Sequence, residues 1–396
     1  MKRAKNYLVV VLGISLLGVG LLVKGSNLAA PATGTWVPAG TMAAARSGAA
    51  TVLLTDGRVL VTGGSDAAGA TLSAAEFFNS DGSFTAAPPM NFARSGHTAT
   101  LLQDGRVLVA GGTDATGNAA QTAELFDPSS NSWTAAGPLM AARSGQTATL
   151  LQNGQLLLAG GAANGAALAS LELFDPMSNA FSLAPATLST ARQSHAAALL
   201  SDGRVLVMGG WDGTTVAPVP PATTGTPNVL ASSDIYDPAA GTVTAGPAMN
   251  SARMNFTATV QLDGNVAVIG GSNGQADLAS IEVFDPAAGS FVLGGSLATA
   301  RSGHLAFLLP HNANILIVGG SSAGVALSSV ELYTPWTAAT SVTGPMASAR
   351  ASAAGSPLSG TVAATSTSPS TGYGLDGMLM VAGGLDTNHS PLATSE

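Results

Sequence analysis

Arginine recurs along this sequence at a nearly constant spacing, so its chemistry is the first to explain. Seven arginines each precede an apolar stretch in successive copies of one pattern: Arg46, Arg94, Arg143, Arg192, Arg253, Arg301 and Arg350. The three other arginines after residue 30, Arg58, Arg106 and Arg204, each follow an Asp-Gly pair. A catalytic residue is usually needed once, whereas a residue that every repeat requires recurs. The pattern therefore predicts a structural role for the seven arginines.

Acidic residues occupy a second recurring place, about thirty residues after most of these arginines. They are Glu76, Glu124, Glu172, Asp234, Glu282 and Glu331, with Glu396 at the same place in the last copy. If each copy forms four antiparallel strands, the arginines and these acids begin strands at the same end of the sheet. We therefore expect them to meet as buried, structural ion pairs.

The strands that position these side chains can be predicted by aligning the copies on their Gly-Gly pairs. These stand at Gly63-Gly64, Gly111-Gly112, Gly160-Gly161, Gly209-Gly210, Gly270-Gly271, Gly319-Gly320 and Gly383-Gly384, and most of their spacings are 48 or 49 residues. The clearest copy predicts strands over 96–102, 106–110, 122–126 and 132–135. Asp104-Gly105 between two apolar runs indicates a tight hairpin. Four antiparallel strands repeated in this way are typical of a propeller blade.

The repeat resembles the kelch family, whose unit of roughly 50 residues has a hydrophobic strand ending in Gly-Gly, then an acidic and aromatic strand, then a Trp. Here E-x-F-D-P occurs at Glu124, Glu172 and Glu282, and Trp occurs at Trp36 and Trp133. The resemblance covers Trp36 to the end of the sequence. It implies an all-β, seven-bladed kelch-type propeller over residues 33–396, with the first strand of each blade lining a central channel.

The two ends of the sequence are complementary within this repeat. The segment around Trp36 matches a fourth strand, whereas the last copy stops at Glu396, at the start of its third strand. We expect the N-terminal strand to pair with the last blade and close the ring, which removes free sheet edges. The seventh blade is expected to be incomplete, or the sequence to be a fragment.

Two sets of polar residues could bind metal ions. Asp66, Asp114, Asp212 and Asp386, with Asn273, lie two residues after a double glycine. They could form a carboxylate ring for a cation or a basic partner, but Asx turns that cap their own loops are favoured. His97, His195 and His304 each lie three residues after a repeat arginine. Zinc needs all its ligands about 2 Å from one centre, so histidines in alternate blades predict hydrogen bonding at the channel mouth rather than a metal site.

Composition excludes several classes of function. Only 9% of residues are charged and the net charge is -8, so no basic surface is expected for nucleic acid. The sequence has no cysteine, and hence no disulfide, thiolate metal site or cysteine nucleophile. The kelch family includes galactose oxidase-like copper enzymes, so the resemblance also suggests that activity. The cofactor of those enzymes needs a tyrosine crosslinked to a cysteine, and this sequence has no cysteine. We therefore expect a protein without catalytic residues or cofactors. A galactose oxidase-like or lyase-like enzyme is the alternative.

The first thirty-two residues differ from the rest. Lys2, Arg3 and Lys5 precede an apolar run over 7–23, which predicts an export signal peptide or an uncleaved membrane anchor. The propeller is thus expected in the periplasm, at the cell surface or outside the cell, with membrane contact only through this segment.

Two insertions depart from the repeat, over 211–233 and 356–376. Trp211 begins the first, where other copies have a smaller or aliphatic residue, and an exposed indole can stack on a sugar or anchor a partner. We therefore expect a monomeric module that binds a protein or glycan at one set of loops. The predicted contact residues are Trp211, Asp212, Ser95, Ser144, Gln193 and Ser302. The alternative is that Trp211 only packs under its own loop.

Overall fold

The structure is a computed structural model that describes residues 35–216, 225–309, 312–358 and 378–396. The predicted signal or anchor over 1–32, the central part of the first insertion and most of the second lie outside the described residues. Within the described ranges the chain consists of strands and one short 3-10 helix, η1 (Pro335–Thr337). None of the helical structure there is long and apolar enough to cross a membrane.

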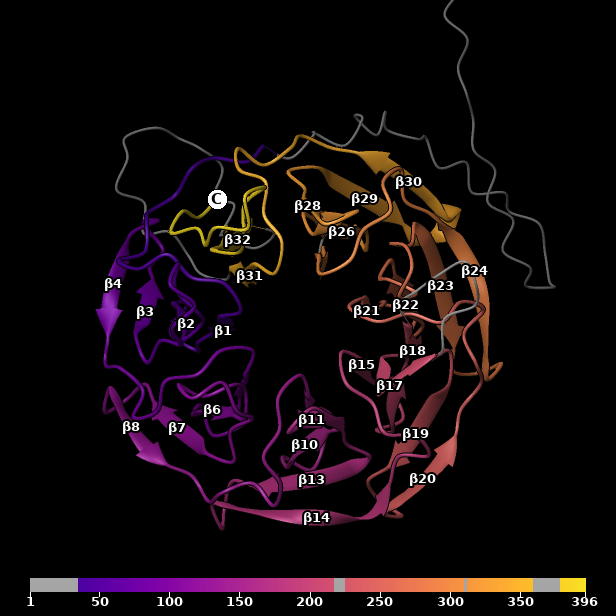
Figure 1. Ribbon diagram of the computed structural model, residues 1–396, viewed down its shortest axis with the longest axis horizontal. Helices are drawn as coiled ribbons and strands as arrows, with labels where there is room; N and C mark the ends of the chain where they lie inside the picture. The colour runs from indigo at the N-terminus through magenta and orange to yellow at the C-terminus, as the bar shows by residue number, and fades with distance from the viewer. Residues whose placement is uncertain (1–34, 217–224, 310–311, 359–377) are drawn as a thin grey trace, which may run out of the picture. The chain divides into compact units, whose positions relative to one another are not determined.

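Six four-stranded antiparallel sheets form blades, whose strands run in chain order from the inside outward (Figure 1). Blade 1 holds β1 (Ala50–Leu53), β2 (Val59–Thr62), β3 (Ala75–Phe78) and β4 (Phe84–Ala87). Blade 2 holds β5 (Thr98–Leu101), β6 (Val107–Ala110), β7 (Ala123–Asp127) and β8 (Ser132–Ala135). Blade 3 holds β9 (Thr147–Leu150), β10 (Leu156–Ala159), β13 (Ser170–Asp175) and β14 (Ala180–Thr187).

The next three blades repeat this order. Blade 4 holds β15 (Ala196–Leu199), β16 (Val205–Met208), β19 (Ser233–Asp237) and β20 (Thr242–Ala245). Blade 5 holds β21 (Thr257–Val260), β22 (Val266–Ile269), β23 (Ser280–Asp285) and β24 (Ser290–Ser296). Blade 6 holds β25 (Leu305–Leu308), β26 (Ile315–Val318), β29 (Val330–Thr334) and β30 (Ala339–Val342). The strands predicted in the clearest copy agree with β5 to β8 to within a few residues.

Three blades carry a small extra hairpin between their second and third strands. These are β11 (Ala162–Ala163) with β12 (Ala166–Ala167), β17 (Trp211–Val216) with β18 (Thr226–Val229), and β27 (Ser321–Ser322) with β28 (Val325–Ala326). By strand order these hairpins lie at the end of the blade that carries the repeat arginine, which we call the arginine end. The Asp-Gly turns lie at the opposite end, which we call the hairpin end.

The prediction of seven four-stranded blades is wrong in its count, because the described residues form six complete blades. The seventh repeat forms a two-stranded sheet of β31 (Ala354–Leu358) and β32 (Met378–Ala382). Third strands elsewhere have four to six residues, whereas here Ser395 pairs with Ala382 of β32 through an isolated bridge and no third strand is assigned among the described residues. Val381 and Glu396 exchange two backbone hydrogen bonds of 2.9 Å, which is too short a ladder for a strand.

The ring nevertheless continues through this repeat. β31 lies beside both β25 and β1, and each other inner strand lies beside the next (Figure 1). The predicted N-terminal closing segment is not an assigned strand. It reaches the last repeat through isolated hydrogen bonds, from Ala39 N to Ser395 O at 3.0 Å and from Met42 N to Ala393 O at 2.9 Å.

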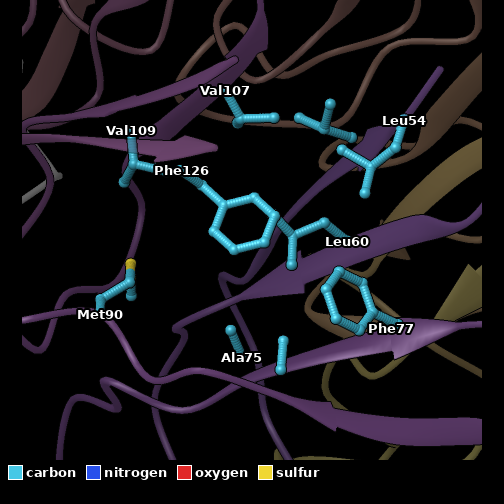
Figure 2. Close-up of a cluster of buried hydrophobic side chains, with 10 residues drawn as sticks. Leu54, Leu60, Ala75, Phe77, Met90, Val107, Val109 and Phe126 are labelled. Carbon is cyan, nitrogen blue, oxygen red and sulfur yellow. The ribbon is translucent and has the colours of Figure 1, made fainter. Parts of the chain in front are cut away.

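The hydrophobic core lies between neighbouring blades. Figure 2 shows Leu60 and Phe77 of blade 1 facing Phe126 of blade 2, and the two phenylalanine rings are 5.9 Å apart between centroids. Trp133 packs on Phe126 and donates its indole N–H to the carbonyl of Pro88, at 2.8 Å. Each blade thus completes its core only against the next, as expected for repeat proteins.

Candidate functional site

The seven repeat arginines each form an ion pair with the recurrent acid of the same repeat, which lies on the third strand in blades 1 to 6 and is Glu396 in the seventh repeat. The nitrogen–oxygen distance is 3.1 Å for Arg94–Glu124 and 3.0 Å for Arg192–Asp234. The other pairs are Arg46–Glu76, Arg143–Glu172, Arg253–Glu282, Arg301–Glu331 and Arg350–Glu396. No side chain in these pairs is more than 7% exposed, and this burial sets them apart from ordinary surface ion pairs.

The surroundings of Arg94 show what each pair holds. Its guanidinium donates to the carbonyls of Gly111 and Thr122, both at 2.9 Å, and to Glu124. Glu124 also accepts the backbone N–H groups of Asn91 and Phe92, in the linker from blade 1. Burial lowers the pKa of Arg94, and the Glu124 carboxylate opposes that shift. One buried pair therefore joins the second strand, the third strand and the linker between blades.

The arginine backbone joins neighbouring blades directly. Gly64 of blade 1 donates its N–H to the carbonyl of Arg94, at 2.9 Å. The preceding Gly63 has a φ of 56°, and a Cβ there would lie 2.3 Å from the same carbonyl oxygen, so the double glycine is needed for this close approach. Gly384 makes the equivalent bond to Arg46, which connects the seventh repeat to blade 1.

Blade 4 carries a weaker version of the pair, because Asp234 replaces glutamate. Its Oδ2 accepts from Arg192 and, at 3.2 Å, from Ser189 N. Its Oδ1 is buried without a partner, whereas Glu282 in blade 5 uses both oxygens. The shorter side chain therefore leaves one buried oxygen unsatisfied.

The three histidines do not come together. Each is buried, and its Nε2 lies within hydrogen-bonding distance of a threonine hydroxyl: Thr62 for His97, Thr147 for His195 and Thr257 for His304. Burial and the charge of the neighbouring arginine lower each pKa to about 3. The imidazoles are therefore neutral at physiological pH.

The aspartates after the double glycines cap their own loops. Oδ1 of Asp66 accepts from Ala68 N and Ala70 N, both at 2.9 Å, and Asp114 makes the same pattern with Thr116 and Asn118. Asp386 does so with Asn388 and Ser390. These are the favoured Asx turns. Among the described residues, no group of three His, Asp or Glu side chains is placed to hold a metal ion.

The predicted ligand-contact residues fall into two groups. Trp211, Asp212 and Gln193 lie together, because Trp211 and Gln193 exchange backbone hydrogen bonds of 2.9 and 3.0 Å. Ser95, Ser144 and Ser302 occupy the position of Gln193 in other blades, where they pair with Thr113, Ala162 and Ser321. All six are half-buried at the arginine end, but only the first three form one cluster.

The cluster holds the β17–β18 hairpin in place. The indole N–H of Trp211 donates to the carbonyl of Thr214 at 2.5 Å. Asp212 accepts from the N–H and hydroxyl of Thr214 and, at 2.6 Å, from the side-chain amide of Asn228 on β18. Burial raises the pKa of Asp212, but these hydrogen bonds outweigh that effect and lower it overall. Thr214, Thr215 and Val216 beyond them are exposed.

Sequence reasoning missed a groove of about 410 Å³ between blades 5 and 6, at the hairpin end. Its lining includes Gln261, Asp263, Leu293, Tyr333 and Trp336. Two signals were present in the sequence: Gln261 stands where the six other repeats have leucine, and Trp336 stands where four blades have serine, methionine or alanine.

A radical-copper site of the oxidase type does not fit the donors present. The chain has no cysteine to link to a tyrosine, and His97, His195 and His304 are engaged with threonines in separate blades. Tyr236 and Tyr333 lie on third strands within the blades. We therefore derive no chemistry through copper.

Comparison with known proteins supports the same fold. Residues 93–140 match the Kelch motif family. The chain is similar in structure to a fungal alcohol oxidase of the AA5 family described in complex with copper, with a TM-score of 0.70, 16% identity and coverage of 92% of this chain and 76% of the oxidase. It is also similar to YjhT, with a TM-score of 0.57, 16% identity and coverage of 76% and 99%. No curated protein sequence matches it. With the kelch pattern recurring around a ring of antiparallel blades, the chain is a kelch-repeat β-propeller.

Proposed function

We propose that this chain is a non-catalytic binding module that holds a protein or glycan ligand at its arginine end. The observation that carries the proposal is the β17–β18 hairpin, in which one departure from the repeat combines a half-buried indole with the exposed residues Thr214, Thr215 and Val216. The side-chain hydrogen bonds of Trp211 and Asp212 hold the shape of the hairpin, and backbone hydrogen bonds between Trp211 and Gln193 attach it to blade 4. A variable loop on a rigid scaffold is where recognition usually resides.

The proposal includes export of the protein and a monomeric state. The basic residues at 2, 3 and 5, followed by the apolar run over 7–23, support delivery outside the cytoplasm, either free or anchored. Cell fractionation and accessibility to external protease test whether the protein is exported. Light scattering of the purified chain tests whether it is a monomer.

The experiment for binding compares two matched variants. Trp211→Ala combined with Asp212→Ala removes the indole and the hairpin clamp, whereas Asp114→Ala removes an equivalent Asx turn in blade 2. Both are presented to a glycan array and to proteins of the native envelope. We expect the double variant to lose the ligand that the wild type captures, with a melting temperature within about 2 °C of the control.

Two results would overturn the proposal. In the first, the double variant melts lower but binds as well per folded molecule, so that Trp211 only holds its loop. In the second, the chain takes up copper and produces hydrogen peroxide from an alcohol. The likeness to the fungal oxidase is the reason to measure the second outcome.

A further inference from the structure

The groove between blades 5 and 6 collects several departures from the repeat. It lies at the hairpin end, between the β21–β22 turn and β24 on one side and β29 with η1 on the other. These strands are labelled on the right of Figure 1. The groove is at the opposite end of the blades from the β17–β18 hairpin, so an inference about it does not depend on the function proposed above.

The first departure is a buried amide with an unused hydrogen-bonding group. Gln261 is only 7% exposed, and its Nε2 has no hydrogen-bond partner among the residues that the structure describes. The same position, eight residues after the repeat arginine, holds leucine in all six other repeats: Leu54, Leu102, Leu151, Leu200 and Leu358, which are buried, and Leu309, which is half-buried. A polar group left unpaired in a buried site is unfavourable unless a ligand or water completes it. The amide therefore points to a ligand in the groove.

The second departure is an exposed indole. Trp336 is 64% exposed, at the position held by Ser129, Met177, Ala239 and Ala287 in other blades. Leu262 and Leu293, which also line the groove, are 69% and 71% exposed. Together they offer a flat apolar surface beside the polar groups.

The remaining polar groups come from Asp263 and Tyr333. Asp56, Asp104 and Asp202 in other hairpins pair with arginine, whereas among the described residues Asp263 accepts only from the backbone and side chain of Asn265, at 3.0 and 2.9 Å. Burial and then the charge of Asp263 raise the pKa of Tyr333, which keeps its hydroxyl protonated. Gly294 leaves space for this hydroxyl, since a Cβ there would lie 2.9 Å from it.

These groups select among classes of ligand. The groove lining contains no lysine or arginine, so an anion would find no counter-charge. A simple cation could lie on Trp336 near Asp263, but it would not complete the amide of Gln261. A sugar hydroxyl both donates and accepts, so it serves this amide in either orientation, and the C–H face of a pyranose can lie on the indole.

We propose that this groove binds one neutral pyranose ring, with Trp336 as the stacking surface and Gln261, Asp263 and Tyr333 as hydrogen-bonding partners. The volume of about 410 Å³ lies within the range of small-molecule sites. Asp263 accepts sugar hydroxyls on its free lone pairs, and Tyr333 donates.

The test observes the indole N–H signals of the four tryptophans in the ¹⁵N-labelled full chain, assigned by Trp→Phe variants. Methyl glycosides of glucose, galactose, mannose and N-acetylglucosamine are titrated in turn. We expect at least one to shift the Trp336 signal saturably, with a dissociation constant on the order of 1 mM. Trp211→Phe should leave this titration unchanged, which separates it from binding at the β17–β18 hairpin.

The decisive variant is Gln261→Leu, because it restores the residue that the six other repeats carry. We expect binding about tenfold weaker, since one hydrogen-bonding partner is lost, with a melting temperature equal to or above that of the wild type. Unchanged affinity in this variant would overturn the proposal. So would a Trp336 signal that no glycoside shifts, or one that tetramethylammonium shifts while the glycosides do not.

Discussion

Ion pairs between arginine and a carboxylate differ between the two ends of the blades: every repeat has one at the arginine end, whereas blades 1, 2 and 4 also have one at the hairpin end. At the arginine end, pairs such as Arg143–Glu172 are fully buried and joined to backbone groups of the linker. At the hairpin end, Arg204–Asp202 bridges a tight turn with side chains 39% and 44% exposed. Water screens the second kind but not the first. The difference teaches that the arginine-end pairs maintain the ring, while the hairpin end is free to vary between blades.

The largest expected effect comes from removing a buried arginine. Arg143→Ala leaves Glu172 buried without its counter-charge and should lower the free energy of unfolding by about 3 to 5 kcal/mol. Urea denaturation measures it. A loss no larger than that of an exposed loop substitution would break the distinction between the two ends.

A smaller effect concerns the buried histidines of the arginine end. Because His97 has a folded pKa of about 3, below its unfolded value, its contribution to stability is complete above about pH 6.5 and declines as pH falls toward 3. His97→Gln places at this position the residue that blade 3 has as Gln146. Between pH 7 and pH 5 the free energy of unfolding of this variant should therefore fall by about 2 kcal/mol less than that of the wild type. Denaturation at the two pH values tests this, and equal losses would indicate that His97 titrates normally.

Blade 4 sharpens the comparison within the arginine end. Asp234 has one carboxylate oxygen without a hydrogen-bond partner among the described residues. The longer side chain of Asp234→Glu should let both oxygens accept hydrogen bonds, and should raise the free energy of unfolding by about 1 kcal/mol. The reverse change, Glu282→Asp in blade 5, should lower it by a similar amount. If both changes destabilise, the fit around each acid matters more than the number of its hydrogen bonds.

The smallest effect is expected at the hairpin end. Arg204→Gln removes a solvent-exposed pair and should change the free energy of unfolding by about 0.5 kcal/mol or less. The same denaturation experiment measures it. A loss above about 2 kcal/mol would mean that the exposed pairs also hold the ring.

Much of this fold follows from local patterns in the sequence. The Asp-Gly turns, the double glycines and the apolar second strands define β5 to β8 almost residue by residue. The meeting of Arg94 with Glu124 follows from strand order, since both begin strands at the same end.

The rest depends on contacts that no single repeat contains. The count of complete blades depends on how β32 pairs with Ser395 and Glu396, which form an isolated bridge and two hydrogen bonds rather than a strand. The bond from Trp211 to Thr214 depends on the twist of an irregular hairpin. The groove depends on the lateral packing of blades 5 and 6, and only an alignment of the repeats reveals Gln261 and Trp336 as exceptions.

A double-mutant cycle in blade 3 tests most directly whether the buried pairs hold the ring. Unfolding free energies are measured by urea denaturation for Arg143→Met, Glu172→Leu and the two changes together, beside a matching cycle on Arg204 and Asp202. The account predicts a coupling energy of at least about 2 kcal/mol for Arg143–Glu172 and less than about 1 kcal/mol for the exposed pair. Equal and small coupling at both ends would contradict it.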